Sequence, residues 1–215
     1  MARTVDPARK LALLADIVDF LLDRPLSTVT FRTLAEGIGV STYTLVYHFG
    51  TKAGMVRDIV ETTAERQRSV LAMVAEETGD LDAHLANLRS SWRLTLQPRN
   101  TKILRLEFEA ALHQSHDGPR AISRAIYERW LVVGVGSLLT MGISREDAER
   151  EIRLIVDTLY GLQFDLIMTG QAELASAAFD VAVEAYERRL RRLIADSPRP
   201  ARPAVRSRTE PSAFA

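Results

Sequence analysis

Residues 30–52 decide the fold, and they read Thr-Phe-Arg-Thr-Leu-Ala-Glu-Gly-Ile-Gly-Val-Ser-Thr-Tyr-Thr-Leu-Val-Tyr-His-Phe-Gly-Thr-Lys. Two short helices joined by a tight turn are expected, because Gly39 can adopt the positive φ of a sharp turn. A hydroxyl side chain stands where each helix would begin, Thr30 for the first and Ser41 for the second, and hydroxyls cap helix N-termini well. The pattern predicts a helix-turn-helix, followed by a third helix that starts near Lys52.

The second helix of this pair would present hydrogen-bonding side chains to its surroundings. Leu45 and Phe49 repeat at a spacing of four and would face inward. The residues left on the outside are Thr42, Tyr43, Thr44, Tyr47 and His48. Compact hydroxyl and ring side chains of this kind can reach base edges and phosphates in the major groove of DNA. We therefore interpret this segment as a DNA-reading unit.

The order of these residues resembles the TetR family of transcriptional regulators. The sequence matches the family pattern at Thr30, Arg32, Leu34, Ala35, Gly39, Val40, Ser41, Thr44, Leu45, His48, Phe49 and Lys52. It departs from that pattern at Val46, where the family usually has tyrosine, and at Tyr43, where a small residue or proline is common. The operator sequence therefore cannot be taken over from relatives.

The resemblance implies a set of DNA contacts. Arg32 and Thr42 would contact base edges, with Tyr43 and Thr44 close to them. Arg32 could pair bidentately with guanine, a contact typically worth about 1–3 kcal/mol of discrimination. Contacts to phosphates, which fix the register of the protein on the duplex, are implied for Thr30, Ser41, Tyr47, His48 and Lys52. Taken singly, each of these residues is better explained as an ordinary surface residue, but together, at the family spacing, they favour DNA contact.

Composition indicates a globular chain with a sizeable core, since 47% of its 215 residues are hydrophobic and 26% are charged. The chain has no cysteine, which excludes disulfides and thiol catalysis. The N-terminal residues lack the apolar run of a signal peptide, and no apolar stretch is long enough to span a bilayer. We expect a cytoplasmic protein without a cofactor.

Net charge allows DNA binding without favouring it. The formal charge is zero, and residues 1–55 contain six basic and five acidic side chains. A strongly basic patch, which would favour DNA through counterion release, is therefore missing. Asp16, Asp19 and Asp23 fall at spacings of three and four, on one face of a helix. We expect this acidic face to be solvated and to point away from the duplex.

Helical periodicity runs through the rest of the chain and predicts an all-α fold of about nine helices. The expected helices cover residues 7–23, the pair within 30–50, and 52–79, 80–97, 101–113, 122–141, 145–169 and 171–195. The helix over 122–141 is apolar nearly all round, so it should be buried centrally. We divide the chain into a DNA-binding domain (1–50), a domain for effector binding and dimerisation (51–195), and a disordered, proline-rich tail (196–215).

The resemblance also implies an effector pocket in the larger domain. Candidate lining residues are Trp92, Phe108, His113, Tyr127, Trp130, Met141, Tyr160, Gln163 and Phe164, with Arg93 and Asp157 as further polar groups. Small-molecule sites are mostly apolar with a few polar groups, which favours an apolar or aromatic effector. The same residue types are also the usual filling of a helical core.

A homodimer is expected, because two-fold pairing doubles the readout on a palindromic operator. The last two helices carry more apolar surface than one core needs. The candidate interface residues are Leu159, Leu162, Leu166, Phe179, Val183, Tyr186 and Leu190.

An enzyme or metal protein and an architectural DNA-binding protein are the two other classes of function to weigh. His113 and His116 are spaced to place two metal ligands on one helical face, but no third ligand follows, and no catalytic constellation emerges. We therefore expect neither an enzyme nor a metal protein. The prediction is a repressor that releases a palindromic operator when a small molecule binds. An effector-independent architectural DNA-binding protein, with a solidly packed larger domain, is the alternative.

Overall fold

The computed structural model describes residues 6–59, 61–62, 80–117 and 121–197, and these residues form helices and no strand. The labelled helices are α1 (Pro7–Leu21), the 3₁₀ helix η1 (Leu26–Thr28), α2 (Phe31–Ile38), α3 (Thr42–Phe49), α5 (Leu81–Thr95), α6 (Pro98–Asp117), α7 (Ala121–Thr140), α8 (Arg145–Thr169) and α9 (Ala172–Asp196). Residues 52–59 add one more helix, so the described residues confirm the predicted all-α fold of nine α-helices.

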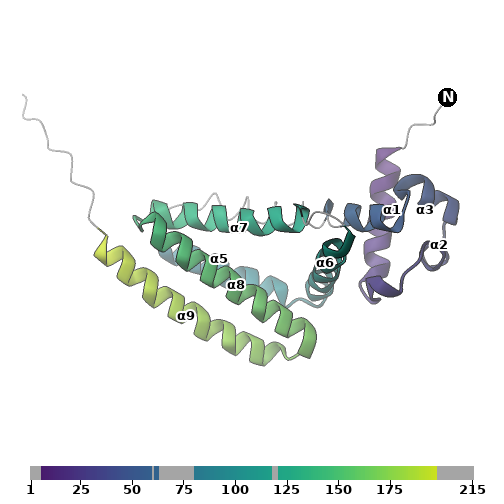
Figure 1. Cartoon of the computed structure of the whole chain (residues 1–215). Coiled ribbons are helices and arrows are strands. Elements are labelled where there is room, and N and C mark those ends of the chain that lie inside the picture. Colours follow the sequence, from purple (N-terminus) through teal and green to yellow (C-terminus); the bar gives the residue numbers. More distant parts are fainter. Residues whose placement is uncertain (1–5, 60, 63–79, 118–120, 198–215) are drawn as a thin grey trace, which may run out of the picture.

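The helices are arranged in two groups joined by α6. Figure 1 shows α1, α2 and α3 at one end of the molecule and α7, α8 and α9 at the other, with α6 between them. Helix α6 contacts η1 on one side and α5 and α8 on the other. Among the described residues, no helix is both long and apolar enough to cross a membrane.

The predicted caps define the helix-turn-helix. Thr30 accepts a hydrogen bond from the amide of Thr33 in a reciprocal capping box, and α2 begins directly after it. Gly39 ends α2 with φ of 70°, in the left-handed region that glycine adopts without strain. Ser41 Oγ then accepts a hydrogen bond from the amide of Thr44, and α3 begins.

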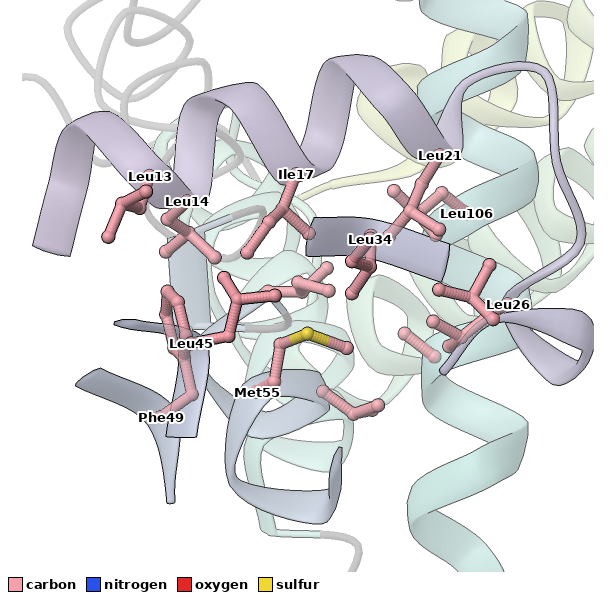
Figure 2. Close-up of a cluster of buried hydrophobic side chains, with 14 of the residues drawn as sticks. Leu13, Leu14, Ile17, Leu21, Leu26, Leu34, Leu45, Phe49, Met55 and Leu106 are labelled. Atoms are coloured by element: carbon pink, nitrogen blue, oxygen red, sulfur yellow. The ribbon is translucent and has the colours of Figure 1, made fainter. Parts of the chain in front are cut away.

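Helices α1, α2 and α3 share one hydrophobic cluster, which we call the head cluster. Its buried residues are Leu13, Leu14, Ile17, Leu21, Leu26, Val29, Leu34, Ala35, Leu45, Phe49, Met55, Val56, Ile59, Leu106 and Ala110. Figure 2 shows Leu106, which comes from α6, lying among the side chains of α1 and α2. The packing unit around the helix-turn-helix thus extends past residue 50 and includes one face of a helix from the larger domain.

The ring of Phe20 on α1 lies directly against Gly37 on α2. A Cβ atom at Gly37 would lie 1.9 Å from Cε2 of Phe20. A side chain at position 37 would therefore require the Phe20 ring to move.

Polar contacts also tie α6 to the end of α1. Arg99 and Lys102 on α6 form ion pairs of 2.6 Å with Asp19 and Asp23. The predicted acidic face is therefore exposed but not simply solvated, because two of its three carboxylates are paired with α6. The hydrogen bond and the charge of Lys102 lower the pKa of Asp23 below its ordinary value.

The larger domain has a second hydrophobic cluster, contributed by α5, α7, α8 and α9. The rings of Trp92 and Phe179 stack with centroids 4.9 Å apart at 6°, and Trp92 Nε1 donates a hydrogen bond to Ser176 Oγ. Trp92, a candidate effector residue, is therefore part of the core.

The prediction that the helix over 122–141 is buried centrally is wrong. Among the described side chains of α7, only Leu138 is buried, and Val132 is 71% exposed. One side of α7 packs on α8, where a Cβ at Gly134 would meet Ile152, and the other side faces outward. Apolar residues on every face do not distinguish a central helix from an outer helix that keeps an apolar surface.

Three predictions fall on residues outside the described ranges. These are the second part of the helix over 52–79, the loop at 118–120, and all but the first two residues of the tail over 196–215.

Candidate nucleic-acid interface

Helix α3 buries one side and exposes the other, as predicted. Leu45 and Phe49 belong to the head cluster, whereas Tyr43 is 78% exposed and Thr42 is exposed as well. The rings of Tyr43 and Tyr47, one turn apart, stack with centroids 6.4 Å apart at 21°. The outer face of α3 is thus a continuous surface of hydroxyl and ring groups.

Two of the predicted phosphate contacts also stabilise the helices. The hydroxyls of Thr30 and Ser41 accept the capping hydrogen bonds of α2 and α3, and Ser41 Oγ lies 2.8 Å from Thr44 Oγ1. A hydroxyl that accepts a hydrogen bond can still donate its own proton to a phosphate oxygen. These residues therefore position the helices whether or not they contact DNA.

The two predicted cationic contacts lie at the edges of this surface. Arg32, on α2, is paired with Glu36 through Nε at 3.1 Å, and the two side chains are 85% and 67% exposed. Exposed pairs of this kind contribute little, so the guanidinium can exchange Glu36 for another partner. Lys52 follows the turn at the end of α3. Its Nζ donates a hydrogen bond of 3.4 Å to the carbonyl oxygen of Ser27 in η1.

His48 is only half-buried, but its ring is turned partly inward. Its edge meets the Tyr47 ring at a centroid distance of 5.1 Å and an angle of 86°. Nδ1 is buried and has no hydrogen-bond partner among the described residues. A contact from His48 to a phosphate would therefore have to use Nε2.

Four candidate effector residues come together in the larger domain, and we call them the aromatic cluster: Phe108 from α6, Tyr127 from α7, and Tyr160 and Phe164 from α8. Tyr160 lies 6.1 Å from Phe108 and 5.6 Å from Tyr127, between ring centroids, and Phe108 lies 6.2 Å from Phe164. Burial raises the pKa of the Tyr160 hydroxyl to about 12, with the carboxylate of Glu107 as a further cause. The hydroxyl therefore stays neutral at physiological pH.

A polar group borders the aromatic cluster. Tyr127 donates its hydroxyl proton to Asp157, which also accepts a hydrogen bond from Arg153 Nε at 3.2 Å. The Arg153 guanidinium lies 5.1 Å from the centre of the Tyr127 ring, within cation–π distance. Asp157, a polar group singled out from the sequence, is therefore adjacent to the rings.

The other candidate effector residues are not part of this cluster. Trp130, Met141 and Gln163 are half-buried, Arg93 is exposed, and the side chain of His113 lies outside the described residues. A surface groove of about 420 Å³ runs along α7 and the start of α8. None of the candidate effector residues lines it; its lining residues are Leu131, Val132, Val135, Gly136, Leu139, Arg145 and Glu149.

Most of the predicted dimer contacts are wrong in detail. Leu166, Phe179, Val183, Tyr186 and Leu190 are buried in the second hydrophobic cluster of their own chain, while Leu159 and Leu162 are partly buried against it. The five buried side chains fill the space between α8, α9 and their neighbours, so only Leu159 and Leu162 keep some apolar surface. The large apolar side chains that α8 and α9 expose are instead Leu154, Phe164, Met168, Leu174 and Val181.

Sequence reasoning missed a row of hydrogen-bonded polar side chains inside the larger domain. His84 Nε2 lies 3.1 Å from the Tyr186 hydroxyl, and His84 Nδ1 lies 3.3 Å from Ser137 Oγ. The three residues come from α5, α9 and α7, so no sequence spacing connects them. Glu151, also buried, is paired with Arg189 at 2.7 Å.

The described residues contain no group of three or more side chains suited to hold a metal ion. The side chains of His113 and His116 lie outside these residues.

The chain is similar to known transcriptional regulators in sequence and in fold. No protein-family model matches the chain. The HTH-type transcriptional regulator EthR of Mycobacterium tuberculosis is 27% identical over 131 residues, which cover 60% of this chain. The match covers 57% of EthR, so the chain spans little more than half the length of this relative.

Solved structures share the fold over most of their length. A transcriptional regulator from Rhodococcus sp. RHA1 superposes with a TM-score of 0.67 at 22% identity, covering 83% of this chain and 96% of that one. A TetR-family regulator from Pectobacterium atrosepticum gives 0.64 at 19% identity, covering 89% and 96%. The chain has the fold of TetR-family regulators. The fold implied by the resemblance of residues 30–52 is confirmed.

The similar proteins EthR and the Pectobacterium atrosepticum protein are transcriptional regulators. The head cluster with α3 on its surface is the helix-turn-helix part of the TetR fold, and α5–α9 form its larger helical part.

Proposed function

We propose that this chain is a TetR-family DNA-binding transcriptional regulator, with α3 as the helix that enters the major groove. The observation that carries this proposal is the outer face of α3, where Tyr43 stacks on Tyr47 and remains 78% exposed. A patch of exposed ring side chains, unlike a single exposed apolar residue, indicates an interaction surface. Arg32, at the edge of the same surface, supplies a mobile cation for a base edge or a phosphate.

The contacts assigned from the sequence remain part of this proposal. Arg32, Thr42, Tyr43 and Thr44 read bases, and Thr30, Ser41, Tyr47, His48 and Lys52 hold phosphates. Residues 1–50 supply this surface, residues 51–195 bind the effector and pair two copies, and the protein acts in the cytoplasm.

A homodimer through α8 and α9 would place two reading heads on a palindromic operator. The exposed apolar residues Phe164 and Met168 on α8, and Val181 on α9, supply free surface for this contact. A Cβ atom at Gly161, three residues before Phe164 on α8, would meet nothing within 4 Å. Gly161 therefore leaves room for a helix of the partner subunit.

We further propose that a small molecule releases the operator by binding at the aromatic cluster. Phe108 is a neighbour of Glu109, and Glu109 Oε2 accepts a hydrogen bond of 2.7 Å from the amide of Leu26 in η1. A ring displaced by an effector would therefore move the helix that holds the reading head. SmeT, which has this fold with a TM-score of 0.64 at 15% identity over 83% of this chain and 90% of its own, is known in complex with triclosan.

The effector-independent alternative is supported by the packing of the aromatic cluster. Its ring centroids are 5.6–6.2 Å apart, which is contact distance, so an effector has to displace a ring to enter. If no compound changes DNA binding, the protein acts as an architectural DNA-binding protein.

Selection of bound duplexes from a random DNA pool tests the proposal. We expect a palindromic sequence whose half-site centres are about 34–36 Å apart, one helical turn. The Arg32→Ala variant, selected in parallel, should enrich this sequence less. Repeating the binding measurement with a compound library should identify molecules that release the operator. A pool without an enriched sequence would contradict DNA recognition.

A further inference from the structure

Helix α3 carries neither lysine nor arginine. Its eight residues are Thr-Tyr-Thr-Leu-Val-Tyr-His-Phe, with His48 turned partly inward. Bidentate pairing to guanine, the commonest specific contact in the major groove, requires arginine or lysine. Helix α3 therefore cannot supply this contact, and Arg32 has to reach for it from α2.

What α3 presents instead is apolar surface. Tyr43 and Val46 are 78% and 46% exposed. They are three residues apart and so lie next to each other on one side of the helix. The apolar feature that the major groove displays is the C5-methyl group of thymine, which side-chain methyl groups and rings contact directly.

The Tyr43 ring is held in position by its neighbour. Tyr47, one turn further along, stacks on it at 21° with a centroid distance of 6.4 Å. A ring supported in this way loses less side-chain entropy when it binds than a freely rotating ring. The face of the Tyr43 ring is therefore preorganised to contact a methyl group. The hydroxyl at the end of the ring remains available.

We infer that Tyr43 and Val46 are specificity-determining residues that read thymine C5-methyl groups in each operator half-site. The inference rests on the proposed function and adds the chemical feature that is recognised. Duplex DNA is the occupant, because α3 lies at the end of the molecule away from α8 and α9 (Figure 1), Tyr43 and Val46 are exposed on it, and a helix-turn-helix places its second helix in the major groove. The half-site should accordingly contain A·T pairs at the positions where α3 enters the major groove most deeply.

Replacement of thymine by deoxyuridine tests this directly, since the two bases differ only in the methyl group. In the operator obtained by selection, each thymine is replaced in turn and the Kd is measured. At the contacted positions, we expect binding to weaken about fourfold for one half-site and about fifteenfold for both, as the loss of one buried methyl group implies. Replacements elsewhere in the site should have no effect.

Three variants assign the methyl contacts to residues. Val46→Ala and Tyr43→Ala should each bind the thymine and deoxyuridine operators equally at the position that the side chain reads. Tyr43→Phe keeps the ring and should keep the discrimination. The three variants change only Tyr43 and Val46, which are exposed and outside the head cluster, so the melting temperature should not change.

Two results would overturn the inference: an operator whose affinity is insensitive to every deoxyuridine, or full discrimination retained by both alanine variants. Either result leaves the proposed function intact, because an operator has been selected and bound. A pool that yields no enriched duplex overturns the proposed function and this inference together.

Discussion

Arg105 of α6 donates a hydrogen bond of 2.8 Å from Nη2 to the carbonyl oxygen of Leu21, the last residue of α1. The same nitrogen reaches the carbonyl oxygens of Leu22 and Arg24 at 3.1 and 3.3 Å. The final carbonyls of a helix have no partner within it. A side chain from the larger domain therefore caps the first helix of the reading head, and this contact would connect the proposed effector site to the DNA-reading surface.

Replacement of this cap should destabilise the protein. Arg105→Met removes hydrogen bonds from a partly buried charged donor to three carbonyls, and we expect the free energy of unfolding to fall by about 1.5–3 kcal/mol. Urea unfolding measures the change. Lys102→Met on the same helix is the control, because its exposed pair with Asp23 should cost at most about 1 kcal/mol. Equal losses of unfolding free energy in the two variants would show that the Arg105 cap stabilises the protein no more than the exposed ion pair of Lys102 does.

Leu106 should behave as a residue of the reading head. It is fully buried in the head cluster, so Leu106→Ala should cost about 3–5 kcal/mol through lost burial and the cavity left behind. Leu112→Ala, on the same helix but 64% exposed, should stay within about 0.5 kcal/mol. Chemical denaturation, followed by operator binding of the folded fraction, distinguishes the two variants.

Arg32 and its partner should have opposite effects on DNA affinity. Arg32→Ala should weaken operator binding about tenfold or more, in the range of a lost base contact, while the melting temperature stays the same because the ion pair is exposed. Glu36→Gln should tighten binding, since it releases Arg32 and removes a negative charge near the phosphates. Titration of a labelled operator gives both Kd values; unchanged affinity in Arg32→Ala would refute the assigned contact.

The aromatic cluster should control the response to effector. Phe108→Ala opens space beside Tyr160 and Phe164, so the effector concentration that releases half of the operator should change at least several-fold. Operator affinity without effector should change much less, because Phe108 does not contact the head cluster. The release curve measured by fluorescence anisotropy tests this, with Trp92→Phe in the core as a comparison.

The buried histidine predicts a pH dependence of stability. Burial lowers the pKa of His84 below its ordinary value of 6.5. The unfolded chain then binds more protons than the folded one as pH falls below 6.5, so stability is complete above this pH and decreases below it. Thermal melting between pH 7.5 and 5.5 should show the decrease, and His84→Gln should remove part of it. An identical slope in the variant would exclude His84 as its source.

Sequence alone predicted the local structure well and the long-range packing poorly. Thr30, Gly39 and Ser41 define the ends of α2 and α3 through contacts with residues at most five positions away, so pattern reasoning located them. Arg105 acts on residues more than 80 positions earlier, and nothing in the local sequence distinguishes it from another exposed arginine.

The same reason explains the errors in the larger domain. Phe179 and Val183 repeat at helical spacing, which shows that one side of α9 is apolar. The spacing does not show whether this side packs within the chain or on a second copy, and here it packs within the chain. Phe108 and Tyr160 were found because their residue types suit a pocket, but their meeting depends on how α6 crosses α8.

The place of Leu106 in the head cluster constrains how such regulators can be recombined. A chimaera that joins residues 6–62 of this chain to the body of a relative would carry a hydrophobic surface shaped for a helix left behind. To transplant the operator preference intact, one face of α6 has to be exchanged along with it. The reading head and this face of α6 therefore have to change together whenever one of them changes.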